Sequence, residues 1–360
     1  MKNTEIRKLL IVKMSAVGDV VMALPALAAL RRAWPGAAID WLAEPPAAGL
    51  LEGLPGLRRL IVSPRRGLGG LVKGGRPREA RRLLWNFRTD LRSEDYDVVL
   101  DLQGLWKSAV NVWLSRGRRK VGFARTREHS GWALNEKMPA YDPEKHAVRR
   151  YLDAAAYLGA DPSWPATEPY YQPPPAAEAE AGELLAALGE SAGAFLVLNP
   201  GAKWLTKRWP LRHWERLAAR ASASGRALVV TGGREDLPLG QAISQAAEGG
   251  GVLNLCGRTS LPVLGAVLAR ASAVITADTG PMHLAAAVGG GGLALFGPTR
   301  PKRTGPFGGH FQIMTPPAGC LGCLKKNCPQ PCLELLSPEL VWDRAHRFLE
   351  QEARPCPVSA

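Results

Sequence analysis

The residues best suited to chemistry stand at the ends of apolar runs that read as β-strands. In "VITADTGPMH" (274–283) the run ends at Asp278, Thr279 and Gly280, and His283 follows one turn into the next predicted helix. Backbone N–H groups at a helix N-terminus are unpaired and the helix dipole is positive there, so this turn suits a phosphate. Asp278 would repel an anion, and we expect it to cap the helix and orient the turn. A capped strand–helix turn without a ligand is the alternative.

Two more turns of the second half have the same form. "KWLTKRWP" (203–210) follows the apolar run "LVLNPG", and we expect its Lys207 to neutralise a diphosphate. "TGGREDLP" (231–238) follows "ALVV", and its Glu235 could accept a hydrogen bond from a ribose hydroxyl or merely cap a helix. A solvated basic loop is the alternative for the first of these turns. The three turns together favour a phosphate-bearing ligand more strongly than any one of them does.

One carboxylate stands apart, near the start of the chain. Asp19 lies in "LLIVKMSAVGDVVMALPALAALRRAWPG" (9–36), between a glycine and a tract that reads as a helix. It could cap that helix, or it could act as a base at the mouth of a ligand site, and the two roles are compatible. Lys13 could hold the charge of an acceptor or of a leaving phosphate.

The phosphate signals come without the motifs of the commonest nucleotide-binding folds. The chain has no G-x-x-x-x-G-K-[ST] loop, which excludes a P-loop NTPase, and no G-x-G-x-x-G in its first strand–helix turn, which argues against a dinucleotide-dependent oxidoreductase. A ligand held by its phosphates in the second half suggests a nucleotide-sugar donor. Glycosyl transfer from such a donor needs a base that takes the proton of the acceptor hydroxyl, and Asp19 is the candidate.

The composition is that of an ordinary globular protein with an excess of positive charge. Of 360 residues 46% are apolar and 22% charged, and 46 Lys and Arg against 32 Asp and Glu give a formal charge of +14. Such a charge attracts nucleic acid, anionic lipid headgroups or phosphorylated substrates. Aromatic residues are not interleaved with the basic clusters as a single-strand platform requires, so nucleic acid is disfavoured as a partner. Lys13 and Asp19 interrupt the N-terminal apolar tract, and we expect a mature cytoplasmic start without a membrane span.

Short apolar runs alternate with helical tracts along the chain, which indicates βαβ units and parallel sheets. The length makes two domains the default. We expect an α/β fold of two Rossmann-like, doubly wound domains that face each other across a cleft. The expected parts are an acceptor-binding domain (1–165), a Pro-rich linker (166–185), a nucleotide-sugar-binding domain with a Cys-rich tail (186–335) and a C-terminal helix that packs back towards the first domain (336–360).

Several segments resemble one enzyme family. They resemble, in the same order, segments of the bacterial lipopolysaccharide heptosyltransferases, glycosyltransferase family 9. The segments are "LLIVKMSAVGDVVMALPALAALRRAWPGAAIDWLAE", "YDVVLDLQGLWKSA", "EKHAVRRY", "KRWPLRHW" and "ADTGPMHLAAAVG" with "LFGPTRP". The resemblance spans about residues 10 to 350, and the first half looks most like the type I enzymes. It implies the GT-B fold, an ADP-heptose donor, a lipid A–Kdo acceptor, inversion at the anomeric carbon and no cofactor required for catalysis.

Carried over motif by motif, the resemblance gives a role to each matching position. The base falls on Asp19. The donor site falls on Lys207, Glu235, Asp278, Thr279, Gly280 and His283, and the acceptor site on Lys13, Ser15, Lys107, Arg127 and Arg150, with Arg65 or Arg66 from a glycine-rich loop. An anionic acceptor would explain the basic first half, and it implies transient contact of a cytoplasmic, peripheral protein with the inner membrane surface.

The end of the chain departs from the type I pattern. "CLGCLKKNCPQPC" places Cys320, Cys323, Cys328 and Cys332 within 13 residues. Four thiolates so close could hold a structural zinc or iron ion tetrahedrally, could form disulfides, or could remain thiols, and no step of the expected chemistry needs a metal. Cys256 lies in an apparent strand, and we expect it to be buried.

The sequence therefore predicts an inverting glycosyltransferase that moves L-glycero-D-manno-heptose from ADP-heptose to a Kdo or heptose hydroxyl of the lipopolysaccharide inner core. A family 9 transferase with another acceptor, such as the heptose II or III position or a protein, or with another nucleotide sugar, is the alternative. A non-catalytic nucleotide-sugar-binding protein is a third hypothesis, and the intact set of Asp19, Lys207 and Asp278 argues against it.

Overall fold

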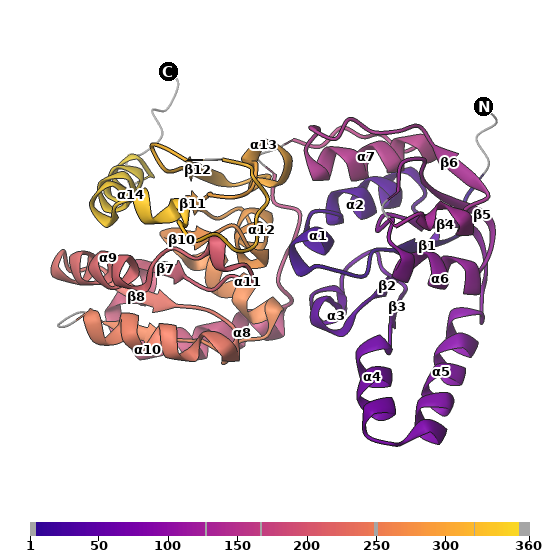
Figure 1. Ribbon diagram of the computed structural model, residues 1–360, viewed down its shortest axis with the longest axis horizontal. Helices are drawn as coiled ribbons and strands as arrows, with labels where there is room; N and C mark the ends of the chain where they lie inside the picture. Colours follow the sequence, from indigo (N-terminus) through magenta and orange to yellow (C-terminus); the bar gives the residue numbers. More distant parts are fainter. Residues whose placement is uncertain (1–4, 127, 166–167, 248–250, 320, 353–360) are drawn as a thin grey trace. The chain divides into compact units, whose positions relative to one another are not determined.

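The computed structural model describes residues 5–352 apart from 127, 166–167, 248–250 and 320. The chain divides into two compact units, Met1–Trp164 and Pro165–Ala360. Each unit contains one six-stranded sheet with helices on both faces (Figure 1), and every neighbouring pair of strands is parallel. The doubly wound α/β architecture predicted from the alternating apolar runs is confirmed.

The sheet of the first unit has the strand order β3-β2-β1-β4-β5-β6. Its central strand is buried on both sides, since each residue from Leu9 to Val12 is at most 1% exposed. A run that is apolar on both faces is what a parallel sheet covered by helices requires. The strands are β1 (Lys8–Val12), β2 (Ala38–Ala43), β3 (Arg59–Val62), β4 (Asp95–Asp101), β5 (Arg116–Phe123) and β6 (Glu136–Met138).

Helices cover both faces of this sheet. They are α1 (Val17–Val21), α2 (Leu24–Ala33), α3 (Pro45–Leu51), α4 (Arg65–Lys73), α5 (Pro77–Leu91), α6 (Trp106–Leu114) and α7 (Ala147–Leu158), with the 3-10 segment η1 (Ser130–Ala133). Phe87 and Leu91 of α5 and Ala109 and Val112 of α6 pack with the strands on one face. On the other face α2 packs against α7. The helices α4 and α5 pack against each other as a hairpin that projects from the unit (Figure 1).

The sheet of the second unit has the order β12-β11-β10-β7-β8-β9. Its strands are β7 (Phe195–Asn199), β8 (Ala227–Val230), β9 (Val252–Asn254), β10 (Ala273–Ala277), β11 (Gly291–Leu295) and β12 (His310–Met314). Its helices are α8 (Pro175–Leu185), α9 (Leu211–Ala223), α10 (Leu237–Ala246), α11 (Leu261–Arg270), α12 (Gly280–Ala287), α13 (Pro301–Thr304) and α14 (Pro338–Glu352), with the 3-10 segments η2 (Ala186–Gly193), η3 (Leu205–Lys207), η4 (Arg234–Asp236) and η5 (Cys332–Leu335). None of the helices in the described part of the chain combines the length and apolar character that a membrane span needs.

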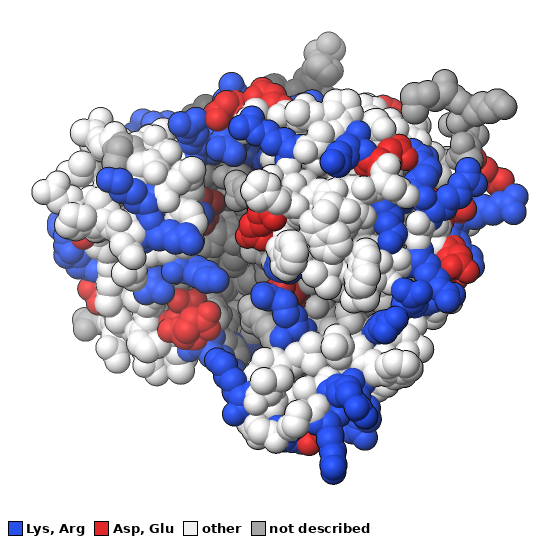
Figure 2. Space-filling view, turned by 45° about the vertical axis from the view of Figure 1, so that its right-hand side comes forward, with Lys and Arg blue, Asp and Glu red and all other residues white. Residues whose placement is uncertain are grey.

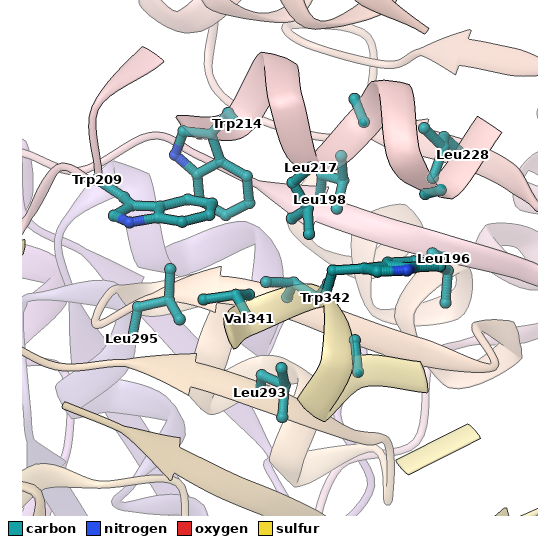
Figure 3. Packing of buried hydrophobic residues seen from close by; sticks show 14 of the residues in the cluster. Leu196, Leu198, Trp209, Trp214, Leu217, Leu228, Leu293, Leu295, Val341 and Trp342 are labelled. Carbon is teal, nitrogen blue, oxygen red and sulfur yellow. The ribbon is translucent and has the colours of Figure 1, made fainter. Parts of the chain in front are cut away.

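One large apolar core joins a face of the second sheet to α9 and α14. Figure 3 shows the indoles and aliphatic side chains that meet there: Leu196, Leu198, Leu228, Leu293 and Leu295 from the sheet, Trp209, Trp214 and Leu217 from α9 and the loop before it, and Val341 and Trp342 from α14. The rings of Trp209 and Trp214 meet edge to face, with centroids 4.9 Å apart and planes at 84°, an arrangement that aromatic quadrupoles favour. Trp209 Nε1 donates to the carbonyl of Leu336 at 2.8 Å, which fastens the loop before α9 to the segment before α14.

Two parts of the chain differ from the domain division expected from the sequence. Residues 175–185, expected to belong to a linker, form α8, which packs against α11. Proline is tolerated in the first turn of a helix, so the proline run ends where this helix begins. The C-terminal helix was expected to pack back towards the first domain. Its apolar residues instead lie in the core of the second unit, where the surface that they need to bury is available: Val341, Trp342, Ala345, Phe348 and Leu349.

Replacing Trp342 tests the place of α14 in the second unit. The side chain is 9% exposed, and its truncation leaves a cavity, so we expect Trp342→Ala to lower the free energy of unfolding of this unit by about 3–5 kcal/mol. Urea unfolding of the full chain, followed by circular dichroism, gives the measurement. Trp85→Ala is the matched control, because that indole is 65% exposed and its loss should change stability by less than about 0.5 kcal/mol. Equal effects of the two variants would contradict the assignment.

Candidate active site

Three turns of the second unit lie side by side at the carboxyl edge of its sheet. β8, β7 and β10 are neighbours in the sheet, and Glu235, Lys207 and Asp278 follow these strands along the chain. Parallel strands end on the same edge, and open α/β sheets bind their ligands there. The structure therefore places the three sequence-predicted turns at one edge.

An ion pair holds Lys207 in place. Its Nζ lies 2.6 Å from Asp278 Oδ2, and it donates to the Asp278 carbonyl oxygen at 3.1 Å. The same ammonium lies 5.0 Å from the centre of the Trp204 ring, a distance at which the ring quadrupole attracts a cation. The Lys207 side chain is 18% exposed, so the ammonium has a fixed position but still reaches solvent at the edge of the sheet.

The loop that carries Lys207 is anchored on both sides of this residue. Thr206 Oγ1 donates to the carbonyl of Lys325 at 2.7 Å, and Arg208 Nε donates to the carbonyl of Ala202 at 2.7 Å. Trp209 is buried in the core and bonded to the segment before α14. These contacts fix the backbone in the folded protein, so little further conformational entropy is lost when the ammonium meets a ligand.

Asp278 orients Lys207 and does not cap α12, which corrects the expectation from the sequence. Its side chain is 5% exposed, and its Oδ2 accepts from Thr299 Oγ1 at 2.5 Å in addition to the contact with Lys207. The N-cap of α12 is Thr279, whose hydroxyl donates to Asn199 Oδ1 at 3.3 Å. The carboxylate is therefore surrounded by donors, and its charge is balanced inside the turn.

The remaining predicted donor-site residues near the pair of Lys207 and Asp278 differ in burial and in hydrogen bonding. Gly280 opens α12, whose first N–H groups have no acceptor within the helix, and His283 is buried in its first turns. Glu235 is exposed in η4 and is not a cap. The neighbouring Asp236 fills that role, because its Oδ2 accepts from Gly233 N at 2.9 Å. Glu235 thus stays available to a ligand at the edge.

In the first unit, Asp19 occupies the third position of α1 and not the N-cap. Ala16 is the N-cap, and its N–H donates to Asp19 Oδ2 at 3.2 Å, which is the backward half of a capping box. The other oxygen, Oδ1, accepts from the Tyr151 hydroxyl at 3.4 Å and lies 3.8 Å from Lys13 Nζ. The Asp19 side chain remains 42% exposed, so the carboxylate is oriented by these contacts and still open to solvent.

Lys13 is the buried cation of this site. Its side chain is 4% exposed, its Nζ donates to the carbonyl of Leu102 at 3.3 Å, and the ammonium lies 4.9 Å from the centre of the Tyr151 ring. Burial alone would lower the pKa of Lys13, but Asp19, Tyr151 and Asp101 outweigh burial and raise the pKa above its usual value. Lys13 is therefore charged at neutral pH, and its ammonium faces the Asp19 carboxylate.

Asp19 lies in a pocket of the first unit. The pocket has a volume of about 200 Å³, and three cations, Lys13, Arg125 and Arg150, surround the single carboxylate in its lining. The Arg150 guanidinium lies over the Tyr141 ring at 4.8 Å, and its Nε is buried with no hydrogen-bond partner among the described residues. An excess of cations and an unused buried donor favour an anionic ligand.

Ser15 and Lys107 form a second cluster next to this pocket. Lys107 Nζ donates to the Ser15 hydroxyl and lies 2.7 Å from Glu44 Oε1, which Arg65 Nε also approaches, at 3.2 Å. Burial alone would raise the pKa of Glu44, but the hydrogen bonds and charges of Lys107 and Arg65 outweigh it and lower the pKa below its usual value. Gln103 joins the two clusters, because it lines the pocket and its Oε1 accepts from Ser15 N at 3.0 Å.

The sequence-predicted acceptor residues thus gather in two groups, Lys13 and Arg150 in the pocket and Ser15 and Lys107 beside it. Arg127 and the side chain of Arg66 lie outside the described residues. Sequence reasoning gave no role to the partners that orient these groups: Gln103, Glu44 and Tyr151. A signal was present, since Gln103 and Glu44 follow directly after strands and Tyr151 ends the segment "EKHAVRRY".

The cysteine-rich segment packs closely against the loop after β11. A side-chain carbon placed on Gly297 would lie 2.8 Å from Cys332 Sγ, so only glycine fits there. Across the described part of the chain, no three His, Cys, Asp or Glu side chains gather closely enough to hold a metal ion. Cys320 lies outside that part, so a four-cysteine metal site stays a prediction. Cys256 is buried as expected, and burial raises the pKa of its thiol to about 11.

Comparison with known proteins places this geometry in one family. The sequence model of glycosyltransferase family 9 (heptosyltransferase) matches residues 84–334. Lipopolysaccharide heptosyltransferase 1 of Pseudomonas aeruginosa is 35% identical over 335 residues, which cover 89% of this chain and 87% of that protein. The structure of E. coli heptosyltransferase WaaC with ADP is similar with a TM-score of 0.76 at 28% identity, over 96% of this chain and 100% of the other. The same enzyme with ADP-2-deoxy-2-fluoro heptose gives a TM-score of 0.74 at 28% identity over the same shares. These likenesses confirm the expected GT-B fold class.

The pH dependence of stability tests the cluster around Glu44. Because its pKa is lower in the folded chain than the usual 4.5, its contribution to the free energy of unfolding is fully present above that value and is lost as the pH falls through the folded pKa. Lys107→Met removes the nearest cation, so we expect stability to fall less between about pH 7 and about pH 3 in this variant than in the wild type. Urea unfolding at both pH values measures the difference, with the exposed Lys73→Met as control. The same pH dependence in Lys107→Met and the wild type would disprove the coupling.

Proposed function

Because the chain belongs to glycosyltransferase family 9, the heptosyltransferases, we propose that it transfers L-glycero-D-manno-heptose from ADP-heptose to a Kdo hydroxyl of the lipopolysaccharide inner core. The names of the Pseudomonas aeruginosa relative and of the two E. coli structures support this donor and product. The observation that carries the proposal is Asp19, an oriented and exposed carboxylate in a pocket that three cations line. A heptose of the growing core or a protein is the alternative acceptor, and another nucleotide sugar is the alternative donor.

In this proposal the second unit binds the donor. Lys207 neutralises the diphosphate. The backbone N–H groups of Gly280 and Met282 at the start of α12 donate to the same oxygens, since Pro281 between them has no N–H. Thr279 adds its hydroxyl, His283 packs within the helix behind the turn, and Glu235 accepts from a ribose hydroxyl. Negative charge grows on the β-phosphate as the bond to the sugar breaks, so a cation fixed there stabilises the transition state more than the ground state. Lys207 and the helix end supply this positive charge, and the proposed step needs no cofactor.

Asp19 acts as the general base. Its carboxylate takes the proton of the acceptor hydroxyl as that oxygen attacks the anomeric carbon and the bond to the ADP oxygen breaks. Attack from the face opposite the leaving group inverts the anomeric centre. The ammonium of Lys13 attracts the Asp19 carboxylate, and the Tyr151 hydroxyl fixes the direction of one carboxylate oxygen.

The basic residues of the first unit bind the anionic groups of the acceptor. Kdo carries a carboxylate, and Arg150 offers a guanidinium with an unused buried donor beside Lys13. Ser15 and Lys107 give a second polar contact at the edge of the pocket. The lipid A part of such an acceptor stays in the bilayer, so we place the reaction at the cytoplasmic face of the inner membrane.

Replacing Asp19 tests the base. Asp19→Asn keeps the size of the side chain and one of its two accepting oxygens but removes its ability to act as a base. We expect kcat for heptose transfer to fall about 10²- to 10⁴-fold, with the Kd for ADP unchanged by calorimetry. Product masses from ADP-heptose and a panel of truncated core acceptors give the rates. Glu180→Gln, an exposed carboxylate on α8, is the control. Near-normal transfer by Asp19→Asn would show that another group is the base.

A pair of variants separates the donor site from the acceptor site. Lys207→Met removes a charge-assisted contact of about 1.5–3 kcal/mol, so we expect the Kd for ADP to rise about 10- to 100-fold. Arg150→Met should leave that Kd unchanged and raise the acceptor KM by a similar factor. Calorimetry with ADP and steady-state kinetics on the acceptor measure the two quantities. A rise of the Kd for ADP in Arg150→Met, or none in Lys207→Met, would contradict the division of roles.

A further inference from the structure

Three tryptophans form an exposed cluster on the first unit. Trp106 and Trp113 lie seven positions apart on α6, so they share one face of that helix. Trp132 of η1 contacts both, with ring centres 5.4 Å from Trp106 and 6.4 Å from Trp113. The three side chains are 55%, 60% and 47% exposed in chain order. Tryptophan is highly buried on average, and a contiguous exposed apolar patch marks an interaction site.

The fold itself does not require this tryptophan cluster. α6 packs on the sheet through Ala109 and Val112, which are fully buried. None of the three indoles belongs to the apolar core of the first unit as far as the structure describes it. Their apolar surface therefore stays available to a partner.

Basic side chains flank the tryptophan cluster. Arg116, Arg118 and Lys120 alternate along β5 and so project from the same face of the strand. Lys120 Nζ donates to the carbonyl of Trp113 at 3.1 Å, which places this face of β5 next to α6. No acidic residue occurs between Trp106 and Lys120. Two carboxylates reach this surface from other segments, Asp95 at 3.9 Å from Arg116 and Glu128, whose Oε2 accepts from Trp106 N at 3.0 Å, and the three cations of this face of β5 outnumber them.

The hairpin of α4 and α5 extends the basic surface. Residues 65–92 carry nine Lys or Arg and two acidic residues, and Val72 and Trp85, each 65% exposed, add apolar area. Arg92, at the end of α5, donates to the carbonyl of Leu114 at 3.2 Å and so ties the hairpin to α6. Figure 2 shows Lys and Arg side chains crowded on the tip that projects at the bottom of the molecule.

We propose that the tryptophan cluster and the basic side chains around it form the surface through which this protein binds an anionic lipid bilayer. An indole ring has an apolar body and a polar N–H and therefore favours the headgroup region. Each Lys or Arg near an anionic leaflet contributes about 1 kcal/mol. Apolar insertion and charge together give reversible attachment, whereas either alone is marginal.

The geometry favours lipid over the other partners that such a surface could attract. The indoles contact one another with ring planes tilted by 48° and 53°, so they form one compact cluster and not a row of separate platforms for successive bases. A protein partner would need acidic groups opposite the cations and an apolar centre opposite the cluster. An anionic bilayer offers both without a complementary shape.

The surface also adjoins the pocket that contains Asp19. Gly104 and Leu105 line that pocket and directly precede Trp106. A side-chain carbon on Gly131, the neighbour of Trp132, would lie 3.7 Å from the hydroxyl oxygen of Thr126, which also lines the pocket. If the proposed function holds, the lipid of the acceptor stays in the bilayer at the tryptophan cluster while its sugar reaches the pocket. This consequence rests on the proposed function.

Vesicle binding tests the inference without any sugar substrate. The full-length protein is mixed with phosphatidylcholine vesicles with or without about 30% phosphatidylglycerol, and co-sedimentation gives the bound fraction. We expect the wild type to prefer the anionic vesicles and the triple variant Trp106→Ser, Trp113→Ser, Trp132→Ser to bind them at least about tenfold more weakly. The control Leu237→Ser, Leu335→Ser removes side chains that are 42% and 54% exposed on the second unit and should bind as the wild type does.

A charge variant gives an independent second readout. The double variant Arg116→Gln, Arg118→Gln leaves α6 intact. It should weaken binding to anionic vesicles without changing binding to neutral ones. If the triple variant fails to fold, this double variant alone tests whether the surface binds anionic lipid. Wild-type binding by both variants, or no preference of the wild type for anionic lipid, overturns the proposal. A shift from dimer to monomer in the triple variant with vesicle binding unchanged would also overturn it and assign the surface to a second copy. ADP binding, unchanged in both variants, separates failure of this inference from failure of the proposed function.

Discussion

Half-buried pairs of a lysine and a carboxylate organise both functional edges of this protein. Lys207 with Asp278 in one unit, and Lys13 with Asp19 in the other, place opposite charges close together, and one member of each pair is buried. Burying Asp278 or Lys13 without a partner would be costly, and the partner offsets that cost while fixing the direction of both side chains. Each pair keeps one member partly exposed, so a ligand can contact a charge that is already oriented. In the proposed reaction these side chains would therefore be oriented before substrate binds, as transition-state stabilisation requires.

The parallel sheets determine where these ion pairs lie, and the surrounding helices and loops determine which ligands can reach them. Strands that run in one direction bring their following turns to one edge, so Lys207 and Asp278 can pair although they belong to different turns. Lys13 and Asp19 pair within the one segment that follows β1. In the second unit Trp209 and the segment before α14 hold the lysine turn against the core. In the first unit the tryptophan cluster lies beside the pocket of the candidate base. In the proposed function, this neighbourhood would bring a membrane-bound substrate and the Asp19 carboxylate to the same side of one domain.

Much of this arrangement could be predicted from the sequence, because it depends on local signals. Apolar runs followed by glycine turns gave the strand ends, and the period of the helical tracts gave the doubly wound architecture. Asp278 was identified because a charged residue directly after a buried strand has little choice of position: the strand delivers it to the carboxyl edge. Lys207 and Asp19 lie further along the turns that follow β7 and β1, and the order of strand, turn and helix indicated their place. The metal-site hypothesis for the cysteines could not be decided in the same way, since close spacing permits coordination, disulfides and thiols alike.

The sequence by itself thus determined the two α/β folds and which charged side chains stand at the strand ends. Only the tertiary structure decided their partners. Asp278 was expected to cap a helix, yet it pairs with a lysine 71 positions earlier. Asp19 could have been an N-cap, yet it is the third residue of its helix and bonds to Tyr151, 132 positions away. Capping is a local preference of less than about 2 kcal/mol, whereas a buried charge left without a counter-charge costs more. Asp278, which is 5% exposed, therefore takes the partner that the packing of distant segments brings within reach. Asp19 is more exposed and keeps its local bond to Ala16 N beside the distant one to Tyr151.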